Sequence, residues 1–443
     1  MSCPNRPSLL RHLCLCCTVL LGSALPALEM SPVYLGSPFM QGWVPDDVPV
    51  LRGLIVLDGF PLDGRWNEAA RHWRFGIFRL NGDGYTDQID EDDPTEAALA
   101  DGMVARGKAI LHGIDLLAER TGHPELAHVP WVTAGYSRYS GPAQRLVEVF
   151  PGRVLCFLTG FGISSATIND KITSQRHSWL ETPSQFLGCE WENIYSGGDK
   201  RTLLTPWRRA PGVLRMAGMT WRVYHNPHNY SDLGMIFVDQ VIKERLPADW
   251  DPRSGPPTLR PVQEAQGWLG SHAHWYIPVE TIAETETENA TIAPFEAFEG
   301  DRTRASWILN EAVAWVWRAM SSRQPEATII HPGHPTVVVH EAKDPPPVLS
   351  NEHGLHAGEP FLVQVQAESR DLVRIDLFAN QRPLGGTERF SGGETALGST
   401  RHAIADVEVT IDEPGVYGLL ARYTTRDGRV GWAHPVPMIV QRP

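Results

Sequence analysis

The sequence has few cysteines, no excess of basic residues and, beyond its N-terminus, no apolar run long enough to cross a bilayer. Its 52 acidic and 39 basic residues give a net charge of −13, whereas nucleic-acid binding needs a basic surface. Of six cysteines, only Cys156 and Cys189 lie beyond the N-terminal segment, and neither forms a C-x-x-C metal pair. We therefore expect no nucleic-acid partner, no metal site and no disulfide framework. The two cysteines are expected on neighbouring core strands, and a single disulfide between them is one alternative.

The N-terminus has the pattern of a secretory signal peptide. Arg6 and Arg11 precede the apolar run 13–21, which is followed by the small and turn-forming residues 22–27. We assign residues 1–27 to a signal peptide and expect a secreted or periplasmic protein without a transmembrane segment after signal removal. An uncleaved anchor is the alternative.

The length of 443 residues predicts two or three domains. Apolar runs that predict strands alternate with helical periodicity in the first part of the chain, which predicts a mostly parallel sheet with helices on both faces. The expected strands are 51–57, 75–80, 131–134, 154–159, 185–188 and 219–224, and the expected helices are 66–73, 97–120, one after Ser137, one from Asp232 and 304–320. We assign residues 28–330 to this α/β domain.

The C-terminal part has a different pattern. Residues 331–347 are rich in proline and predict a linker. Beyond them, short alternating runs separated by turn signals predict an antiparallel β-sandwich over residues 348–443. The expected strands are 361–367, 372–378, 403–411, 416–423 and 436–441. This region resembles the immunoglobulin-like modules of bacterial secreted proteins, for which a spacer is the expected role and polymer binding the alternative.

A strand, a sharp turn and a helix are predicted around Ser137. Residues 131–134 form a short apolar run, and apolar residues recur at helical spacing after Gly141. A serine at such a turn can expose its hydroxyl, with the next backbone N–H available to an oxyanion. The alternative is a serine that only caps the helix. Ser140, already inside the helix, is a weaker candidate.

These residues resemble the nucleophile elbow Gly-x-Ser-x-Gly of the α/β-hydrolase family, in particular bacterial secreted serine esterases. Gly135, Ser137 and Arg138 fit the elbow, but Tyr139 stands where the family has glycine. The resemblance implies a catalytic Ser137 and an oxyanion hole made by the amides of Arg138 and Phe60. The loop 61–65 is an alternative source of the second amide.

The resemblance also implies the chain order serine, acid, histidine. His228 is our candidate base, with His225 as the alternative, in the loop after the last predicted strand. Glu192 is the first candidate acid, just past the strand before it, and Glu190 and Asp199 remain open. An acyl-transfer serine needs such a base, and the base needs a carboxylate that orients it.

The expected function is a secreted serine carboxylic-ester hydrolase that needs no cofactor. Its substrate class stays open between small esters, an acylated polysaccharide and a polyester. A non-catalytic binding protein on a degenerate hydrolase scaffold and a serine peptidase of the same fold are the alternatives. The sequence does not predict the oligomeric state.

Overall fold

The protein is described here from a computed structural model. The described residues are 33–35, 40–58, 64–80, 96–160, 182–189, 212–220, 230–271, 289–322, 327–332, 355–367, 372–394 and 401–443. All of them belong to one compact unit, Pro32–Pro443. None of the helices in these ranges is long and apolar enough to span a membrane.

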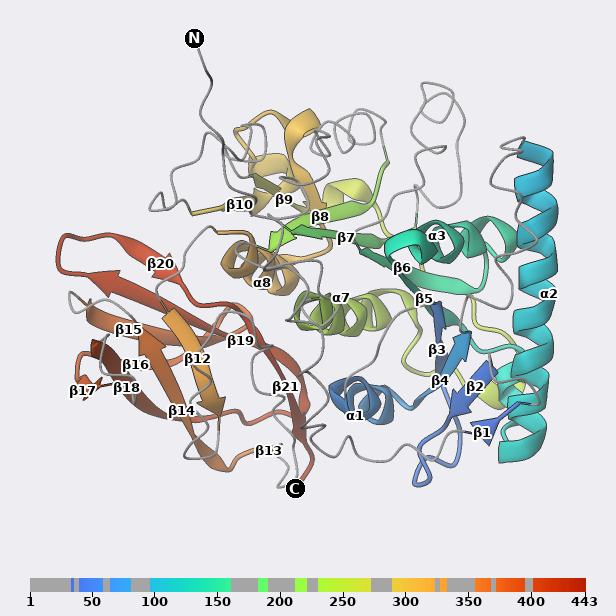
Figure 1. Cartoon of the computed structure of the whole chain (residues 1–443), viewed down its shortest axis with the longest axis horizontal. Coiled ribbons are helices and arrows are strands. Elements are labelled where there is room, and N and C mark those ends of the chain that lie inside the picture. Colours follow the sequence, from blue (N-terminus) through green and yellow to red (C-terminus); the bar gives the residue numbers. More distant parts are fainter. Residues whose placement is uncertain are drawn as a thin grey trace, which may run out of the picture. The chain divides into compact units, whose positions relative to one another are not determined.

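A mostly parallel sheet of eight strands forms the N-terminal part (Figure 1). Its order is β1-β2-β4-β3-β5-β6-β7-β8, with β2 antiparallel to β1 and β4 and the other pairs parallel. The strands are β1 (Val33–Tyr34), β2 (Met40–Trp43), β3 (Gly53–Asp58), β4 (Phe75–Leu80), β5 (Trp131–Tyr136), β6 (Val154–Gly160), β7 (Ser184–Cys189) and β8 (Arg215–Thr220).

Helices cover both faces of this sheet. Among the described residues these are α1 (Gly64–Trp73), α2 (Glu96–Thr121), α3 (Ser140–Val149) and α7 (Tyr230–Arg245) (Figure 1). Successive residues of a strand point to opposite faces, so in β3 Leu54 packs in the core with α2 and α3, and Ile55 packs in the core with α1 and α7. A sheet buried on both faces explains why the strands read as continuous apolar runs.

The helices follow from local sequence signals. In α1 the buried residues recur at the spacing of one helical face: Trp66, Ala69, Ala70 and Trp73. The helix α2 ends where Gly122 adopts a φ of 74° and donates its N–H to the carbonyl of Ala118 at 3.0 Å. The short helix η3 (Pro124–Ala127) then leads into β5.

A small antiparallel sheet and the helix α8 (Glu311–Ser321) lie beside β8. The sheet has the order β10-β9-β11, with β9 (Trp268–Ser271), β10 (Thr291–Pro294) and β11 (Ser306–Ile308). The Nε1 of Trp317 in α8 donates to the carbonyl of Ala217 in β8 at 2.6 Å. Short 3-10 helices precede or connect these elements: η8 (Pro252–Ser254), η9 (Glu264–Gln266), η12 (Phe295–Ala297) and η13 (Arg302–Arg304).

The C-terminal part is a mostly antiparallel β domain of two sheets. One sheet has the order β12-β14-β18-β17 and the other β13-β21-β19-β15-β16, with β20 on β19. Among the described strands of this domain, only β13 and β21 pair in parallel. The strands are β12 (Ala327–Pro332), β13 (Leu355–His356), β14 (Pro360–Ala367), β15 (Leu372–Ala379), β16 (Arg382–Thr387), β17 (Ser391–Glu394), β18 (Arg401–Thr410), β19 (Gly415–Thr425), β20 (Val430–Trp432) and β21 (Val436–Gln441). Side chains from both sheets share one core, as in a sandwich.

The β domain packs directly against helices of the α/β part. The ring of Trp315 on α8 lies 5.2 Å from that of Phe378 on β15 and 5.9 Å from that of Trp432 on β20. Phe378 and Trp432 belong to the same buried cluster as residues of α7 and α8. The C-terminal domain therefore shares a continuous apolar core with the α/β part.

The predicted fold class is confirmed, whereas several bounds differ from the prediction. The last strand of the parallel sheet begins at Arg215, whereas the sequence predicted a start at Met219. Arg215 is charged and interrupts the apolar run, yet it is buried as the first residue of the strand. The predicted helix 304–320 begins only at Glu311, where the side chain of Asn310 caps it, and Trp307 lies on β11. β12 spans the predicted domain boundary and pairs with β14.

Candidate active site

Ser137 lies at a sharp turn between β5 and α3. It is the first residue of the short helix η4 (Ser137–Tyr139), which continues directly into α3. Its φ is 54°, in the left-handed region that costs a residue with a Cβ on the order of 1–3 kcal/mol. Such strain persists only where the surroundings impose it, and it is the backbone form expected of a nucleophile elbow. Ser137 is half-buried, and the N-cap of η4 is Tyr136 and not Ser137.

Gly135 allows the helix to approach the strand. A Cβ at this position would lie 2.1 Å from the carbonyl oxygen of Tyr139 and 2.9 Å from the Cβ of Ala143. Only glycine fits such an approach to backbone atoms. Tyr139, which departs from the elbow pattern, is accommodated with its side chain half-buried and an ordinary φ of −83°.

Ser140 is a structural residue and not a second nucleophile. Its Oγ is buried, lies 3.1 Å from the carbonyl of Gly135 and 3.0 Å from that of Gly160, and accepts the N–H of Gly160 at 3.2 Å. The hydroxyl thus ties the start of α3 to the ends of β5 and β6. This tie helps to hold the strained turn at Ser137.

The start of α3 provides a positive electrostatic environment at the serine. In a 3-10 helix the first backbone N–H groups lack a partner within the helix, and the first bond in η4 runs from the Ser140 N–H to the Ser137 carbonyl. The amide of Arg138 is one of these first N–H groups. The dipole of α3 adds to the attraction for an anion near its N-terminus.

The carboxyl ends of the parallel strands meet at one edge of the sheet. Asp58 at the end of β3 is paired with Gly135 near the end of β5. Cys189 at the end of β7 is paired with Thr220 at the end of β8. The chain segments that follow β3, β7 and β8 therefore leave the sheet at the same edge as Ser137.

Most of the other predicted site residues lie outside the described residues. These are the second oxyanion donor, the candidate bases and the candidate acids: Phe60, His225, His228, Glu190, Glu192 and Asp199. Their roles remain predictions from the sequence. Of the predicted site, the structure describes Ser137 and the backbone of Arg138.

The cysteines lie on neighbouring strands, as predicted. Cys156 is a buried, free thiol in β6, and burial raises its pKa to about 12. Cys189 ends β7, which pairs with β6. The raised pKa makes Cys156 a poor nucleophile, because the thiolate is the reactive form.

A charged network near the first turns of α1 and α7 was not predicted from the sequence. Asp232 is 1% exposed, its Oδ1 accepts a hydrogen bond from Nη1 of Arg65 at 2.8 Å, and its Oδ2 lies 2.8 Å from Nε2 of His434. An acidic residue at the start of a helix is a sequence signal for capping. No local signal indicates its partner His434, which lies in the β domain.

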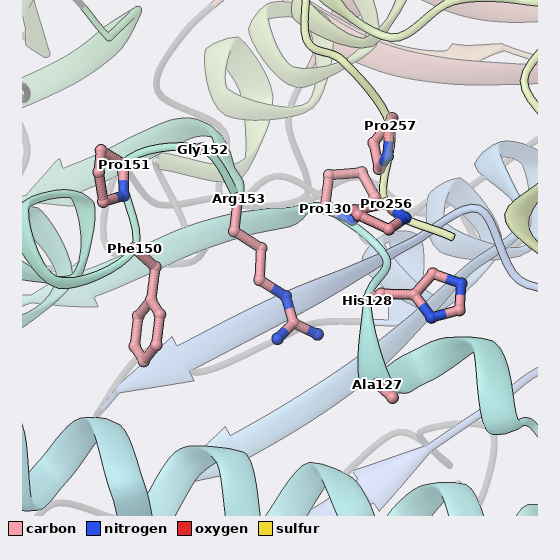
Figure 2. A pocket seen from close by; sticks show the side chains of 9 residues that line it. All are labelled: Ala127, His128, Pro130, Phe150, Pro151, Gly152, Arg153, Pro256 and Pro257. Atoms are coloured by element: carbon pink, nitrogen blue, oxygen red, sulfur yellow. The ribbon is translucent and has the colours of Figure 1, made fainter. Parts of the chain in front are cut away.

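Two cavities of about 300 Å³ each lie at the opposite edge of the sheet. The first is largely apolar, and Figure 2 shows that its side chains come from the end of η3, from the turn between α3 and β6, and from Pro256 and Pro257. The second is lined by arginines and acidic residues near the starts of β3 and β4: Arg52, Arg74, Arg253, Asp249 and Asp251. Neither cavity is lined by Ser137.

No family model matches the chain, and no curated protein matches it. Among solved structures, the chain is similar to a dienelactone hydrolase from Anabaena variabilis, with 12% identity over 44% of this chain and 87% of that chain and a TM-score of 0.28. It is also similar to naproxen esterase, carboxylesterase NP, from Bacillus subtilis, with 13% identity over 44% of this chain and 85% of that chain and a TM-score of 0.25. The fibronectin(III)-like modules of CbhA from Clostridium thermocellum are similar over 26% of this chain and 94% of that chain, with 16% identity and a TM-score of 0.16.

Because these TM-scores are low, the fold assignment rests on the strand order, the strand directions and the connections of the sheet. These features define an α/β-hydrolase-like domain followed by a mostly antiparallel β domain.

Proposed function

We propose that the protein is a secreted serine carboxylic-ester hydrolase that works through an acyl-enzyme. The observation that carries this proposal is the left-handed backbone of Ser137 at a turn between a central parallel strand and a helix. Strained serines at the carboxyl edge of such sheets are the nucleophiles of α/β-hydrolases. Secretion follows from the sequence pattern of residues 1–27.

The proposed reaction uses Ser137 as the nucleophile and His228 as the general base. The Oγ of Ser137 attacks the ester carbonyl while His228 takes its proton, and Glu192 orients the imidazole. The amides of Arg138 and Phe60 bind the oxyanion. The imidazolium then protonates the leaving alcohol, and a water molecule hydrolyses the acyl-enzyme by the same route.

The register of the sheet supports this set of residues. Phe60 follows β3 by two positions, Glu192 follows β7, and His228 follows β8, and these strands end at the same edge as β5. In a parallel sheet, residues that follow the carboxyl ends of several strands form the site. His225, Glu190 and Asp199 follow the same strands and remain alternatives for their roles.

Labelling with a fluorophosphonate tests the proposal, because only an activated serine reacts quickly. We expect the wild-type chain to be labelled on Ser137 and Ser137→Ala to be unlabelled. Ser140→Ala separates the two serines: it should lower the free energy of unfolding by about 2 kcal/mol, because it removes a buried hydroxyl with several partners, and it should slow the labelling, but the label should still be found on Ser137. The adduct is located by peptide mass spectrometry.

A panel of p-nitrophenyl esters and peptide amides then separates an esterase from a peptidase. We expect turnover of the esters and none of the amides. An unlabelled wild-type chain would contradict the proposal and favour a binding protein on a hydrolase scaffold. An adduct that persists in Ser137→Ala would contradict the assignment of Ser137 as the nucleophile.

A further inference from the structure

The carboxylate of Asp232 connects three segments that are distant in the sequence. Its two oxygens have different partners, since Oδ1 accepts from Arg65 and Oδ2 accepts from the Nε2–H of His434, both at 2.8 Å. A carboxylate can only accept, so the imidazole carries its proton on Nε2. Asp232 is 1% exposed, so its bond to the buried Arg65 is shielded from water, where it is stronger than at a surface, whereas the side chain of His434 is 36% exposed.

Two of these segments are the first turns of α1 and α7, and each helix comes directly after a segment that carries a proposed site residue. Arg65 is the second residue of α1, which follows the segment with Phe60. Asp232 is the third residue of α7, which follows the segment with His228. The ion pair thus fixes the first turns of the two helices that begin after the proposed oxyanion segment and the proposed histidine segment.

The third segment belongs to the β domain and is held rigidly. The two residues before His434 are Trp432 and Ala433, which are 2% and 0% exposed. The N–H of Ala433 donates to the carbonyl of Ala421 at 2.8 Å, and Trp432 packs edge-on against Trp315 of α8. His434 therefore follows directly after two buried residues that are held by ring packing and a backbone hydrogen bond, although its own side chain is 36% exposed.

We propose that His434 is a positioning residue for the active site, which makes the β domain part of the catalytic unit rather than a spacer. This inference rests on the proposed function. By donating to Oδ2, His434 holds the Asp232 carboxylate in the orientation that also binds Arg65. A buried carboxylate needs its hydrogen bonds satisfied, so loss of one donor allows the side chain to reorient and the starts of α1 and α7 to shift. Small shifts of reacting groups reduce rates strongly.

The test compares His434→Ala, His434→Gln and His356→Ala in the full chain. The amide nitrogen of glutamine can replace Nε2 as the donor to Asp232. His356 is the matched control, because it is also a histidine of the β domain, with its Nδ1 3.2 Å from the carbonyl of Arg442. The readouts are kcat and KM on a p-nitrophenyl ester, the rate of phosphonylation, and hydrogen exchange in the first hydrogen-bonded turns of α1 and α7.

We expect His434→Ala to lower kcat and the phosphonylation rate about 10- to 100-fold, with KM within about twofold. We expect His434→Gln to recover most of the rate and His356→Ala to match the wild type. Exchange should be faster in both helix starts only in His434→Ala.

A wild-type kcat in His434→Ala would overturn the inference. Equal losses in the alanine and glutamine variants with a lowered Tm would also overturn it, because they indicate a purely structural role. An unreactive serine in the wild-type chain is a separate failure, that of the proposed function. In that case hydrogen exchange still tests whether His434 holds the starts of α1 and α7. Unchanged hydrogen exchange in His434→Ala would overturn this role, and faster exchange confined to the first turns of these two helices would support it.

Discussion

At the amino edge of the parallel sheet, charged side chains bind backbone groups of neighbouring segments, whereas at the carboxyl edge the described turn is strained and closely packed. At the amino edge, Glu125 accepts the N–H of Leu51 at 2.8 Å, and Arg153 donates to the carbonyls of Leu126 and Val129. At the carboxyl edge, Ser137 has a left-handed backbone held by the close approach at Gly135.

This difference indicates a division of roles between the two edges. The amino edge satisfies buried backbone groups, which contributes to stability, since an unpaired buried polar group costs about 1–3 kcal/mol. The carboxyl edge stores strain at the residue that we propose as the nucleophile. Substitutions at the amino edge should therefore change the free energy of unfolding alone, and those at the carboxyl edge should change reactivity as well.

The largest effect is expected for Gly135→Ala. The added methyl group would meet backbone atoms of Tyr139 at 2.1 Å and 2.7 Å, which cannot move aside as a flexible side chain could. We expect a free energy of unfolding lower by about 3 kcal/mol and phosphonylation of Ser137 slower by about 100-fold. Urea denaturation and the labelling rate measure the two effects.

Gly152→Ala is the matched control at the amino edge. A Cβ at Gly152 meets nothing within 4 Å. We expect an unchanged labelling rate and a free energy of unfolding raised by about 0.5 kcal/mol, because alanine restricts the unfolded chain. Equal losses of reactivity in both variants would remove the distinction between the two edges.

A smaller effect, confined to stability, is expected for Glu125→Gln. Glutamine keeps an acceptor for the Leu51 amide but loses the charge that binds the amide and His123, whose Nδ1 lies 2.8 Å from the carboxylate. We expect a free energy of unfolding lower by about 2 kcal/mol at pH 7 and a labelling rate within about twofold of wild type. A large drop in labelling would show that this edge also acts on the site.

The stability difference between the wild type and Glu125→Gln should depend on pH. Burial alone would raise the pKa of the Glu125 carboxyl, but the hydrogen bonds from Leu51 and His123 lower it below its ordinary value of 4.5. A carboxyl with a lowered pKa in the folded state stabilises the fold above its unfolded pKa and loses this contribution as the pH falls through the folded value. The stability difference between wild type and Glu125→Gln should therefore be full at pH 7 and shrink below about pH 4.5.

Local patterns predicted the parts of the fold that local physics determines. The apolar runs of β3, β4 and β6 and the glycine and serine of the elbow could be read from the sequence, because burial on both faces and a left-handed turn each require particular residue types. The predicted helix 304–320 began too early, because Trp307 was counted as part of it, whereas Trp307 lies on β11 and the helix begins only after its cap residue Asn310.

Features that depend on distant partners could not be predicted. Arg215 is charged and therefore interrupts the apolar run, yet it is buried in β8, where its Nη2 lies 3.2 Å from Oγ1 of Thr159 on β6. His434 meets Asp232 across 202 positions of sequence. No spacing in the chain reports such contacts, because the first arises only when the parallel sheet forms and the second only when the β domain packs against α7.

The smallest loss of stability in the comparison of the two edges is expected for Arg153→Lys, in the cavity of Figure 2. The guanidinium lies 4.1 Å over the ring of Trp131 while Nε and Nη2 donate to two carbonyls. Lysine keeps the charge but cannot stack flat and donate in two fixed directions at once. We expect a free energy of unfolding lower by about 1 kcal/mol and unchanged labelling of Ser137, because β5 joins the two only through its rigid backbone. Arg153 binds the chain just before β5, and β5 leads directly into Ser137, so a change in labelling would show that strain at the elbow depends on how β5 is anchored at its other end.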